Sequence, residues 1–207
     1  MKHCSFVRIC REANLPQFSP LEDKQGRELC KAFVNAEKDR RMKERMKLMQ
    51  QATPVGTIAI AESDGAITQL FFSCDTLPPD AELAETALLH EAFQQLQGYL
   101  LGKRQEFSLP LAPAGTPFMQ KVWQCVVNIP YGTTASYQDV AIAVGNSRAV
   151  RAVGMANHRN PLPIVIPCHR VIGSDGSLTG YRGGLSLKMR LLELEHQRLG
   201  SVYLRIL

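Results

Sequence analysis

The chain has 207 residues and a mass of 23.0 kDa, with 45% hydrophobic and 21% charged residues. This balance is that of a globular protein and excludes a disordered or fibrous chain, and no apolar run reaches the roughly 18 residues of a membrane-spanning helix. The length allows one domain or two small ones, because domains average about 150 residues.

The net charge of +5 is distributed unevenly. Residues 1–52 carry a net charge of +5, residues 53–114 one of −6, and residues 115–207 one of +6. A basic C-terminal part beside an acidic middle indicates two units and a face that binds a polyanion. Ordinary surface patterning explains the same charges equally well.

The first residues, Met1-Lys2-His3-Cys4-Ser5, lead into no apolar stretch of a secretory signal. We therefore expect an intracellular protein, cytoplasmic in a bacterium or nuclear in a eukaryote, whose six cysteines are reduced. Cys4, Cys10 and Cys30, together with His3, could act as zinc ligands, but their spacing matches no standard zinc site. We predict no metal and no cofactor.

Residues 1–52 form a basic extension of unknown role. Helix-forming residues predominate from Arg27 to Gln51, which predicts a helix there. Its charged run, residues 38–47, is typical of a solvated helix face, with contact to DNA or to a partner as the alternative.

Residues 53–108 have the pattern of a small α+β domain. Two apolar runs, Val55–Ala61 and Ala66–Ser73, flank Ser63-Asp64-Gly65, which predicts a β-hairpin.

A helix is predicted to follow this hairpin. It opens at Pro78-Pro79-Asp80, has apolar residues such as Leu83, Phe93 and Leu96 mostly on one face, and ends at Gly102. The proline-rich residues 109–115 then read as an interdomain linker.

Residues 116–207 are predicted to form a mostly helical second unit. Thr116 caps a first helix that has Pro117 at its first position. Ser136, with Asp139 three residues later, caps a second helix that ends at Gly145. A further helix from residue 148 to about residue 157 makes this pair a helix-turn-helix candidate. A last helix, capped by Ser186, is expected to run to residue 199.

A reactive cysteine is the main chemical candidate. The stiff segment Asn160–Pro167 leads directly into Cys168 and His169. A neighbouring base activates a thiol by lowering its pKa, since the thiolate is the nucleophile. Taken alone, a single cysteine is more often a small buried apolar residue, and adjacent residues need not face each other.

The order of motifs resembles the O6-alkylguanine-DNA alkyltransferase family, also called methylated-DNA–protein-cysteine methyltransferases. The resemblance covers residues 53–199 approximately. It rests on Phe118-x4-Trp123, Ile129-Pro130-Tyr131-Gly132, Ser136-Tyr137-Gln138, the segment Arg148–Gly154, Pro167-Cys168-His169-Arg170-Val171 and Gly180-Tyr181-Arg182-Gly183-Gly184. It implies an α/β (α+β) fold class, with a ribonuclease H-like α+β domain followed by a mostly helical domain that carries the helix-turn-helix.

The resemblance implies a direct reversal of DNA damage. Cys168 would accept the alkyl group from guanine O6 irreversibly, so that each molecule acts once. His169 would be the base, acting through a bridging water, and Glu195 would orient it. Tyr137 would donate to guanine N3. Without the resemblance, Glu195 reads as a solvated helix residue and Tyr137 as a core aromatic residue.

The remaining residues implied by the resemblance bind the base or the DNA. Tyr181 would form a wall of the substrate pocket, backbone groups near Val171 and Arg182 would read the base edge, and Gly183 would allow close approach of the ligand. Arg151 would fill the position of the flipped base, although an ordinary phosphate contact or a solvated arginine is the simpler interpretation. The positions that match or neighbour backbone contacts are Gln138, Asn146, Arg148 and Ser174, and Asn160 would have a structural role.

The expected partner is double-stranded DNA that contains O6-alkylguanine, with O4-alkylthymine as a second candidate lesion. We expect a monomer and no association with membranes. Ser63 stands where a zinc-binding cysteine occurs in some members, which supports the prediction of no metal. The extension lacks the four-cysteine zinc module of the larger bacterial members, so gene regulation is not predicted.

Three other functions compete with alkyl transfer. An alkylated-DNA damage sensor of this family would lack the cysteine, which is present here as Cys168. A sequence-specific helix-turn-helix regulator leaves the Pro-Cys-His-Arg motif unexplained. A cysteine hydrolase would bind a peptide or ester and turn over repeatedly.

Overall fold

The computed structural model describes residues 46–197. The chain divides into two compact units, Met1–Glu44 and Arg45–Leu207, and every described residue belongs to the second. Among residues 46–197, no helix is long and apolar enough to cross a lipid bilayer. Residues 1–45 of the predicted extension, residues 1–52, therefore lie outside the described part of the chain.

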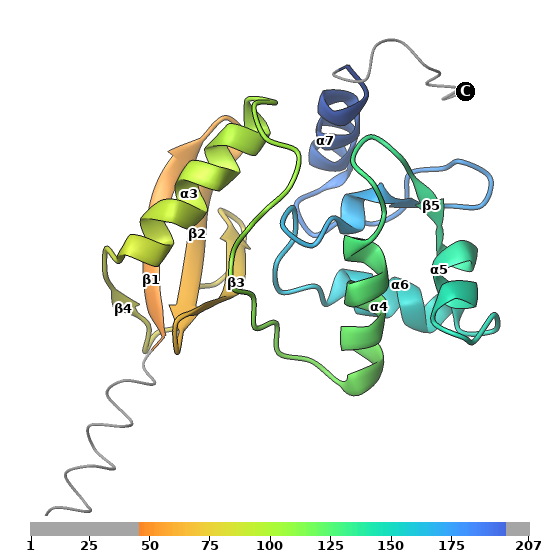
Figure 1. Ribbon diagram of the computed structural model, residues 1–207, viewed down its shortest axis with the longest axis horizontal. Coiled ribbons are helices and arrows are strands. Elements are labelled where there is room, and N and C mark those ends of the chain that lie inside the picture. The colour runs from red at the N-terminus through yellow and green to blue at the C-terminus, as the bar shows by residue number, and fades with distance from the viewer. Residues whose placement is uncertain (1–45, 198–207) are drawn as a thin grey trace, which may run out of the picture. The chain divides into compact units, whose positions relative to one another are not determined.

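A sheet with the strand order β3-β2-β1-β4 forms the first part of the described chain (Figure 1). The predicted hairpin is confirmed, with Asp64 and Gly65 at its turn at φ values of 52° and 74°. Such positive values suit the tight turns that match the twist of two antiparallel strands. The strands are β1 (Lys47–Thr53), β2 (Gly56–Ser63) and β3 (Ala66–Phe72), which run antiparallel, and β4 (Glu82–Leu83), which is parallel to β1.

The helix predicted as far as Gln51 is wrong for residues 47–51, which belong to β1. Every residue of β1 pairs with β2, and Leu48 and Met49 are buried. Pairing and burial outweigh the helix propensity of this segment, which amounts to only tenths of a kcal/mol per residue. The sheet therefore begins within the segment that was assigned to the extension.

Helix α3 (Ala87–Leu100) covers one face of the sheet (Figure 1). Its cap is Thr86, whose hydroxyl accepts from the Leu89 N–H at 3.2 Å. The helix starts later than predicted from Pro78-Pro79-Asp80, because the chain first adds β4, where Leu83 is exposed to solvent. The residues that α3 and the sheet bury together include Ile58, Ile60, Leu70, Leu89, Phe93 and Leu96.

The outer edge of β3 is occupied by two later segments of the chain. Within residues 109–115, which were predicted as a linker, Leu111 forms a bridge with Ile67. Ile67 donates to the Pro110 carbonyl and accepts from Ala112. Leu70 donates to the carbonyl of Pro161, which lies in the segment before Cys168.

Two helices open the second part of the described chain. Helix α4 (Pro117–Val127) begins at the predicted cap, Thr116. Helix α5 (Tyr137–Ala143) begins with the predicted capping box of Ser136 and Asp139. Short polar side chains at these positions satisfy backbone N–H groups that the first helical turn leaves free, which is why both starts are predictable.

The helix-turn-helix is completed by α6 (Val150–His158). This helix starts two residues later than predicted, so Arg148 lies in the turn before it. Indole Nε1 of Trp123 on α4 donates to the Ala156 carbonyl of α6 at 2.9 Å, which ties these helices together.

The chain then crosses the 3₁₀ helix η1 (Cys168–Arg170) and strand β6 (Val171–Ile172), which pairs in parallel with β5 (Ala135–Ser136). Helix α7 (Leu185–Gln197) follows and starts one residue before the predicted cap. Its predicted end at residue 199 lies outside the described residues.

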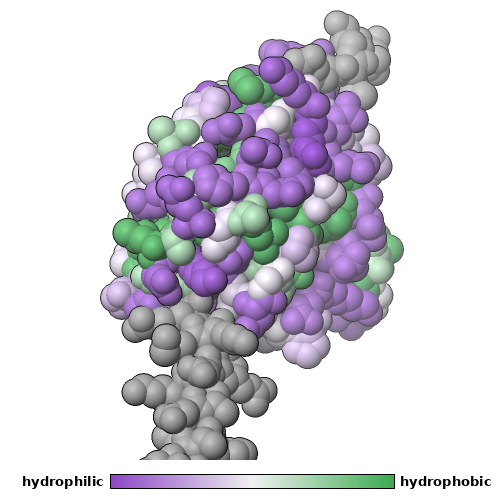
Figure 2. Space-filling view, turned by 60° about the vertical axis from the view of Figure 1, so that its left-hand side comes forward, coloured by the Kyte–Doolittle hydropathy of each residue, from purple (hydrophilic) through white to green (hydrophobic). Residues whose placement is uncertain are grey.

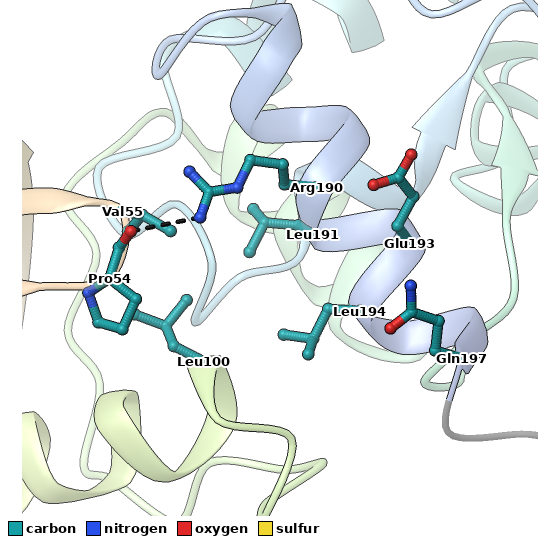
Figure 3. A pocket seen from close by; sticks show the side chains of 8 residues that line it. All are labelled: Pro54, Val55, Leu100, Arg190, Leu191, Glu193, Leu194 and Gln197. Atoms are coloured by element: carbon teal, nitrogen blue, oxygen red, sulfur yellow. Dashed lines mark hydrogen bonds between the residues drawn. The ribbon is translucent and has the colours of Figure 1, made fainter.

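Helix α7 packs against the sheet domain as well as its own. A groove of about 210 Å³ lies between α7, the turn from β1 to β2 and the end of α3 (Figure 3). Across it, Arg190 donates to the Pro54 carbonyl at 3.3 Å. None of the predicted site residues lines this groove.

A continuous apolar core joins the two parts of the described chain. It runs from the sheet and α3 through Trp123 and Val126 of α4 to Leu187 and Leu191 of α7. The sheet domain and the helical part therefore share one apolar core. On the face drawn in Figure 2, hydrophilic residues predominate and hydrophobic ones occupy smaller areas between them.

Candidate active site

The segment between α6 and η1 holds Cys168 in place. Ile166 donates to the Leu162 carbonyl at 2.8 Å, and Cys168 donates to the Ile166 carbonyl at 2.7 Å. Within this segment Ile164 has a φ of 73°. A β-branched residue rarely adopts this left-handed conformation, and it persists only where the surrounding structure enforces it.

Asn160 connects this segment to the thiol. Its amide Nδ2 donates to the Ile166 carbonyl at 2.9 Å and to Cys168 Sγ at 3.2 Å, while its Oδ1 accepts from the Leu162 N–H at 2.9 Å. The structural asparagine expected from the sequence is therefore also a direct neighbour of the sulfur.

The Cys168 thiol is buried, with 6% of the residue exposed. Burial raises the pKa of this thiol, because a thiolate loses hydration there. The hydrogen bond from Asn160 and the charges of Lys188 and Arg182 act in the opposite direction. The thiol thus needs a base before it becomes a nucleophile.

His169 is the adjacent candidate base and is completely buried. Its Nε2 lies 2.8 Å from Glu195 Oε1. An ionised carboxylate can only accept, so Nε2 carries the proton and Nδ1 is the basic nitrogen. Nδ1 is buried and has no hydrogen-bond partner among the described residues. Burial lowers the pKa of His169, which favours the neutral form that a base requires.

Glu195 lies at the centre of a larger hydrogen-bond cluster than the sequence indicated. It accepts from His169, from Tyr99 Oη, from Nε and Nη2 of Arg170 at 3.0–3.2 Å, and from the Gly132 N–H at 2.8 Å. Burial opposes ionisation of Glu195, but its bonds to His169 and Arg170 outweigh burial and lower its pKa to about 2.

Acidification is expected to destabilise the protein through this cluster. The pKa of Glu195 lies below its ordinary value of 4.5, so its charge contributes stability that is present above about pH 4.5 and lost as the pH falls through about 2. The pKa of His169 lies below its ordinary 6.5, so stability also declines below about pH 6.5, where the unfolded chain takes up a proton first. Urea denaturation from about pH 7 to about pH 3 checks this slope. A free energy of unfolding that stays constant over this range would contradict it.

Lys188 on α7 is a second buried charge, which sequence reasoning missed. Its Nζ donates to the Val171 carbonyl at 2.6 Å and to the Thr179 carbonyl at 2.9 Å. Burial lowers its pKa to about 8, and the nearby Cys168 acts against this shift. The Val171 carbonyl, one of the groups expected to read the base edge, therefore already accepts a hydrogen bond from Lys188.

Tyr181 lies beside the candidate base. Its ring meets that of His169 edge to face, with centroids 6.4 Å apart. Its hydroxyl is buried without a hydrogen-bond partner among the described residues. A buried hydroxyl without a partner is costly and uncommon in folded proteins.

Arg182 and Gly183 attach the loop before α7 to the sheet. Arg182 donates to the carbonyls of Leu70 and Asn160. A Cβ on Gly183 would lie 2.6 Å from Leu187 Cδ2 and 3.1 Å from the Phe72 ring. Gly183 therefore packs closely against Leu187 and Phe72, and its role in the approach of a ligand stays a prediction.

Within residues 46–197, none of the residues expected to contact DNA is hydrogen-bonded to Glu195. The Tyr137 hydroxyl accepts from Thr179 Oγ1 at 3.1 Å, and the Tyr137 ring is near Lys188 Nζ, 6.0 Å from its centroid. Gln138 donates to the Ser147 carbonyl at 3.1 Å. Four further positions are exposed in the turns and on the helix of this region, namely Asn146, Arg148, Arg151 and Ser174.

Sequence comparison places these features in a known family. The ribonuclease-like domain of 6-O-methylguanine DNA methyltransferase matches residues 46–113, and the DNA binding domain of that methyltransferase matches residues 117–197. The constitutive methylated-DNA–protein-cysteine methyltransferase of Bacillus subtilis is 52% identical over 150 residues, which are 69% of this chain and 91% of that protein. The chain belongs to this methyltransferase family.

Other methyltransferases of the family are similarly close. The protein of Methanosarcina barkeri is 45% identical, and the match covers 71% of this chain and 95% of that protein. The protein of Mycobacterium leprae is 46% identical, and the match covers 73% of this chain and 94% of that protein. The crystal structure of Mycobacterium tuberculosis OGT in complex with DNA has a TM-score of 0.70 and 40% identity, and the match covers 73% of this chain and 94% of that one. The expected fold, a ribonuclease-like domain followed by a helical domain, is confirmed.

Proposed function

We propose that the chain repairs alkylated DNA directly, by moving the alkyl group of O6-alkylguanine irreversibly onto Cys168. The observation that carries this proposal is a buried thiol that accepts a hydrogen bond from Asn160 and is followed directly by a histidine held by Glu195. A nucleophile, a base and a group that orients the base are the three parts that this chemistry needs. The names of the relatives support the same reaction.

In the proposed reaction, His169 Nδ1 takes the thiol proton through a bridging water. Nδ1 is suited to this task because it is unprotonated and its acceptor site is unused among the described residues. The thiolate attacks the alkyl carbon, so that a sulfur–carbon bond forms as the bond between that carbon and O6 breaks. The electron pair of the broken bond stays on O6, and the alkyl group remains on the protein, which therefore acts once.

The leaving guanine needs a proton as negative charge develops on it. Tyr137 is the proposed donor, and its hydroxyl is held by Thr179. Lys188, near the ring of Tyr137 and bonded to the Thr179 carbonyl, adds positive charge on this side of the site. Tyr181, with its unused hydroxyl, is the proposed wall beside the alkyl group.

A guanine within a duplex cannot reach the thiol of Cys168, a residue that is only 6% exposed. The nucleotide must therefore rotate out of the base stack, at a cost of a few kcal/mol. Arg151, exposed on α6, is the proposed occupant of the vacated position. Gln138, Asn146, Arg148 and Ser174 are proposed to contact the DNA backbone, which makes binding sensitive to salt and independent of sequence.

A damage sensor that binds alkylguanine without chemistry is the alternative. Cys168 is present and is followed directly by His169, whose Nδ1 has no partner among the described residues, which favours transfer over sensing, because a sensor has no need of a nucleophile with a base. No observation in the described residues favours a hydrolase or a gene regulator.

Mass spectrometry of the intact protein and its peptides tests the proposal. After incubation with a duplex containing one O6-methylguanine, we expect one added methyl group on the Cys168 peptide and guanine restored in the DNA. Cys168→Ala is the matched control and is expected to bind the duplex without gaining the methyl group.

The possible outcomes separate the hypotheses. Methylation of Cys168 without a second turnover establishes alkyl transfer. Tight binding to the damaged duplex without an adduct would support the sensor instead. Methylation of another residue would overturn the assignment of Cys168.

A further inference from the structure

The ribonuclease-like domain contributes a side chain to the alkyl-acceptor site. Tyr99 lies on α3, within the residues 46–113 that match this domain, and is completely buried. Its hydroxyl donates to Glu195 Oε1 and lies 3.1 Å from His169 Nε2. Glu195 and His169 belong to the other matched domain, so the hydrogen bonds cross from one domain to the other.

The Tyr99 hydroxyl shares the carboxylate oxygen that holds the proposed base. Oε1 of Glu195 accepts from both Tyr99 and His169 Nε2. Burial and the Glu195 charge raise the pKa of Tyr99, so its hydroxyl remains a neutral donor. Arg170 Nε and Nη2 also donate to this oxygen, and the Tyr99 hydroxyl adds a further donor that disperses the negative charge acting on the His169 ring.

The Tyr99 ring is fixed by aromatic neighbours. Its centroid lies 5.3 Å from that of Phe107, 6.0 Å from that of Tyr131 and 6.5 Å from that of His169. Removal of the hydroxyl alone therefore leaves the ring packing in place, and its effect reports on the hydrogen bond. The ionisable groups that surround the pair of Glu195 and His169 are Tyr99 on α3, Tyr131 before β5, Cys168 and Arg170 on η1, Tyr181 before α7, and Lys188 on α7.

We propose that Tyr99 is a positioning residue for alkyl transfer, through which the ribonuclease-like domain holds Glu195 Oε1 and limits the proton affinity of His169. This inference rests on the proposed function, because it assigns a role within the same site. Without the Tyr99 hydroxyl, Oε1 has one donor fewer and attracts the Nε2 proton more strongly. Nδ1 then becomes protonated at a higher pH, and a protonated Nδ1 cannot accept the proton of Cys168.

Tyr99→Phe tests the proposal in single-turnover kinetics with saturating O6-methylguanine duplex. We expect the acid limb of the rate profile to move to higher pH by about one unit, since the lost bond is to a charged group. Transfer is then about tenfold slower along that limb, recovers toward the wild-type rate at alkaline pH, and occurs with unchanged affinity for DNA.

Gln95→Leu is the matched control on the same helix. Gln95 is buried one turn earlier and bonds to Ser108, away from the acceptor site. Its replacement removes buried hydrogen bonds of α3, and we expect the rate profile to keep its wild-type position on the pH axis. A second probe, 3-fluorotyrosine at position 99, keeps the hydroxyl and makes it a stronger donor, so the acid limb is expected to move to lower pH.

The outcomes distinguish this inference from the proposed function. If the wild-type protein transfers the methyl group to Cys168 and Tyr99→Phe gives the same pH profile of the rate, the role of Tyr99 is overturned and the proposed function stays intact. An equal loss of rate at every pH in Tyr99→Phe and Gln95→Leu would also overturn it, since packing alone would explain the loss. A wild-type protein without Cys168 methylation would overturn the proposed function and the role of Tyr99 with it.

Discussion

Glu195→Gln is expected to slow alkyl transfer by about a hundredfold or more and to lower the free energy of unfolding by about 3–5 kcal/mol. The substitution removes the negative charge that Arg170 and His169 share, while Arg170 stays buried with only 7% of its side chain exposed. An unpaired buried charge is far more costly than the loss of an exposed ion pair. Single-turnover kinetics and urea denaturation measure the two effects separately.

Glu193→Gln is the matched control, because it makes the same chemical change two residues earlier on α7. Glu193 lines the groove next to Arg190 and forms no part of the cluster around Glu195 (Figure 3). Its replacement is expected to leave the rate unchanged and stability within about 0.5 kcal/mol. Equal effects of the two substitutions would show that the charge of α7 as a whole, rather than the Glu195 cluster, determines both properties.

Asn160→Ala is expected to lower the free energy of unfolding by about 2–5 kcal/mol and to make the Cys168 thiol less reactive. The Leu162 N–H would lose its partner in a buried setting, which costs about 1–3 kcal/mol, while the Ile166 carbonyl would keep only its bond from the Cys168 N–H, and each lost bond is worth about 0.5–1.5 kcal/mol. Loss of the donor to Sγ should raise the pKa of Cys168 further, since that bond opposes the effect of burial. Denaturation and the pH dependence of alkylation by a small thiol reagent measure these changes.

Asn157→Ala provides the comparison for this prediction. Asn157 is buried three residues earlier, but its side-chain amide has no hydrogen-bond partner among the described residues. Removing an amide without partners is expected to be nearly neutral or stabilising. A loss of stability as large as that of Asn160→Ala would contradict the importance assigned to the Asn160 hydrogen bonds.

The parts of the fold that depend on local chemistry were predictable from the sequence. The turn at Asp64 and Gly65 and the caps at Thr116 and Ser136 are examples. Each is decided by a few adjacent residues, whose side chains or backbone conformations act within one turn. The β1 segment was mispredicted because its state depends on pairing with β2, which local propensity does not report.

The acceptor site was predictable only in part and mostly through resemblance to a family. The Pro-Cys-His-Arg motif indicated Cys168 and His169, and the structure brings His169 to Glu195, 26 residues later. Tyr99 and Lys188 gave no signal, because an aromatic residue near a helix end and a lysine on a polar helix are ordinary. Only the packing of α3 and α7 against η1 makes them part of the site. Arg170 stood in the motif, but its bonds to Glu195 could not be derived from its position.

The outer edge of β3 has a consequence for association between chains. An exposed edge strand presents free N–H and carbonyl groups to which a second chain can add, which leads to aggregation. Here the N–H and carbonyl groups of Ile67 and Leu70 are already occupied by Pro110, Ala112, Pro161 and Arg182. Proline has no N–H to continue a ladder, so the segments that cover this edge cannot themselves be extended at these positions. The contacts that anchor the segment before Cys168 thus also protect the sheet from growing by strand addition.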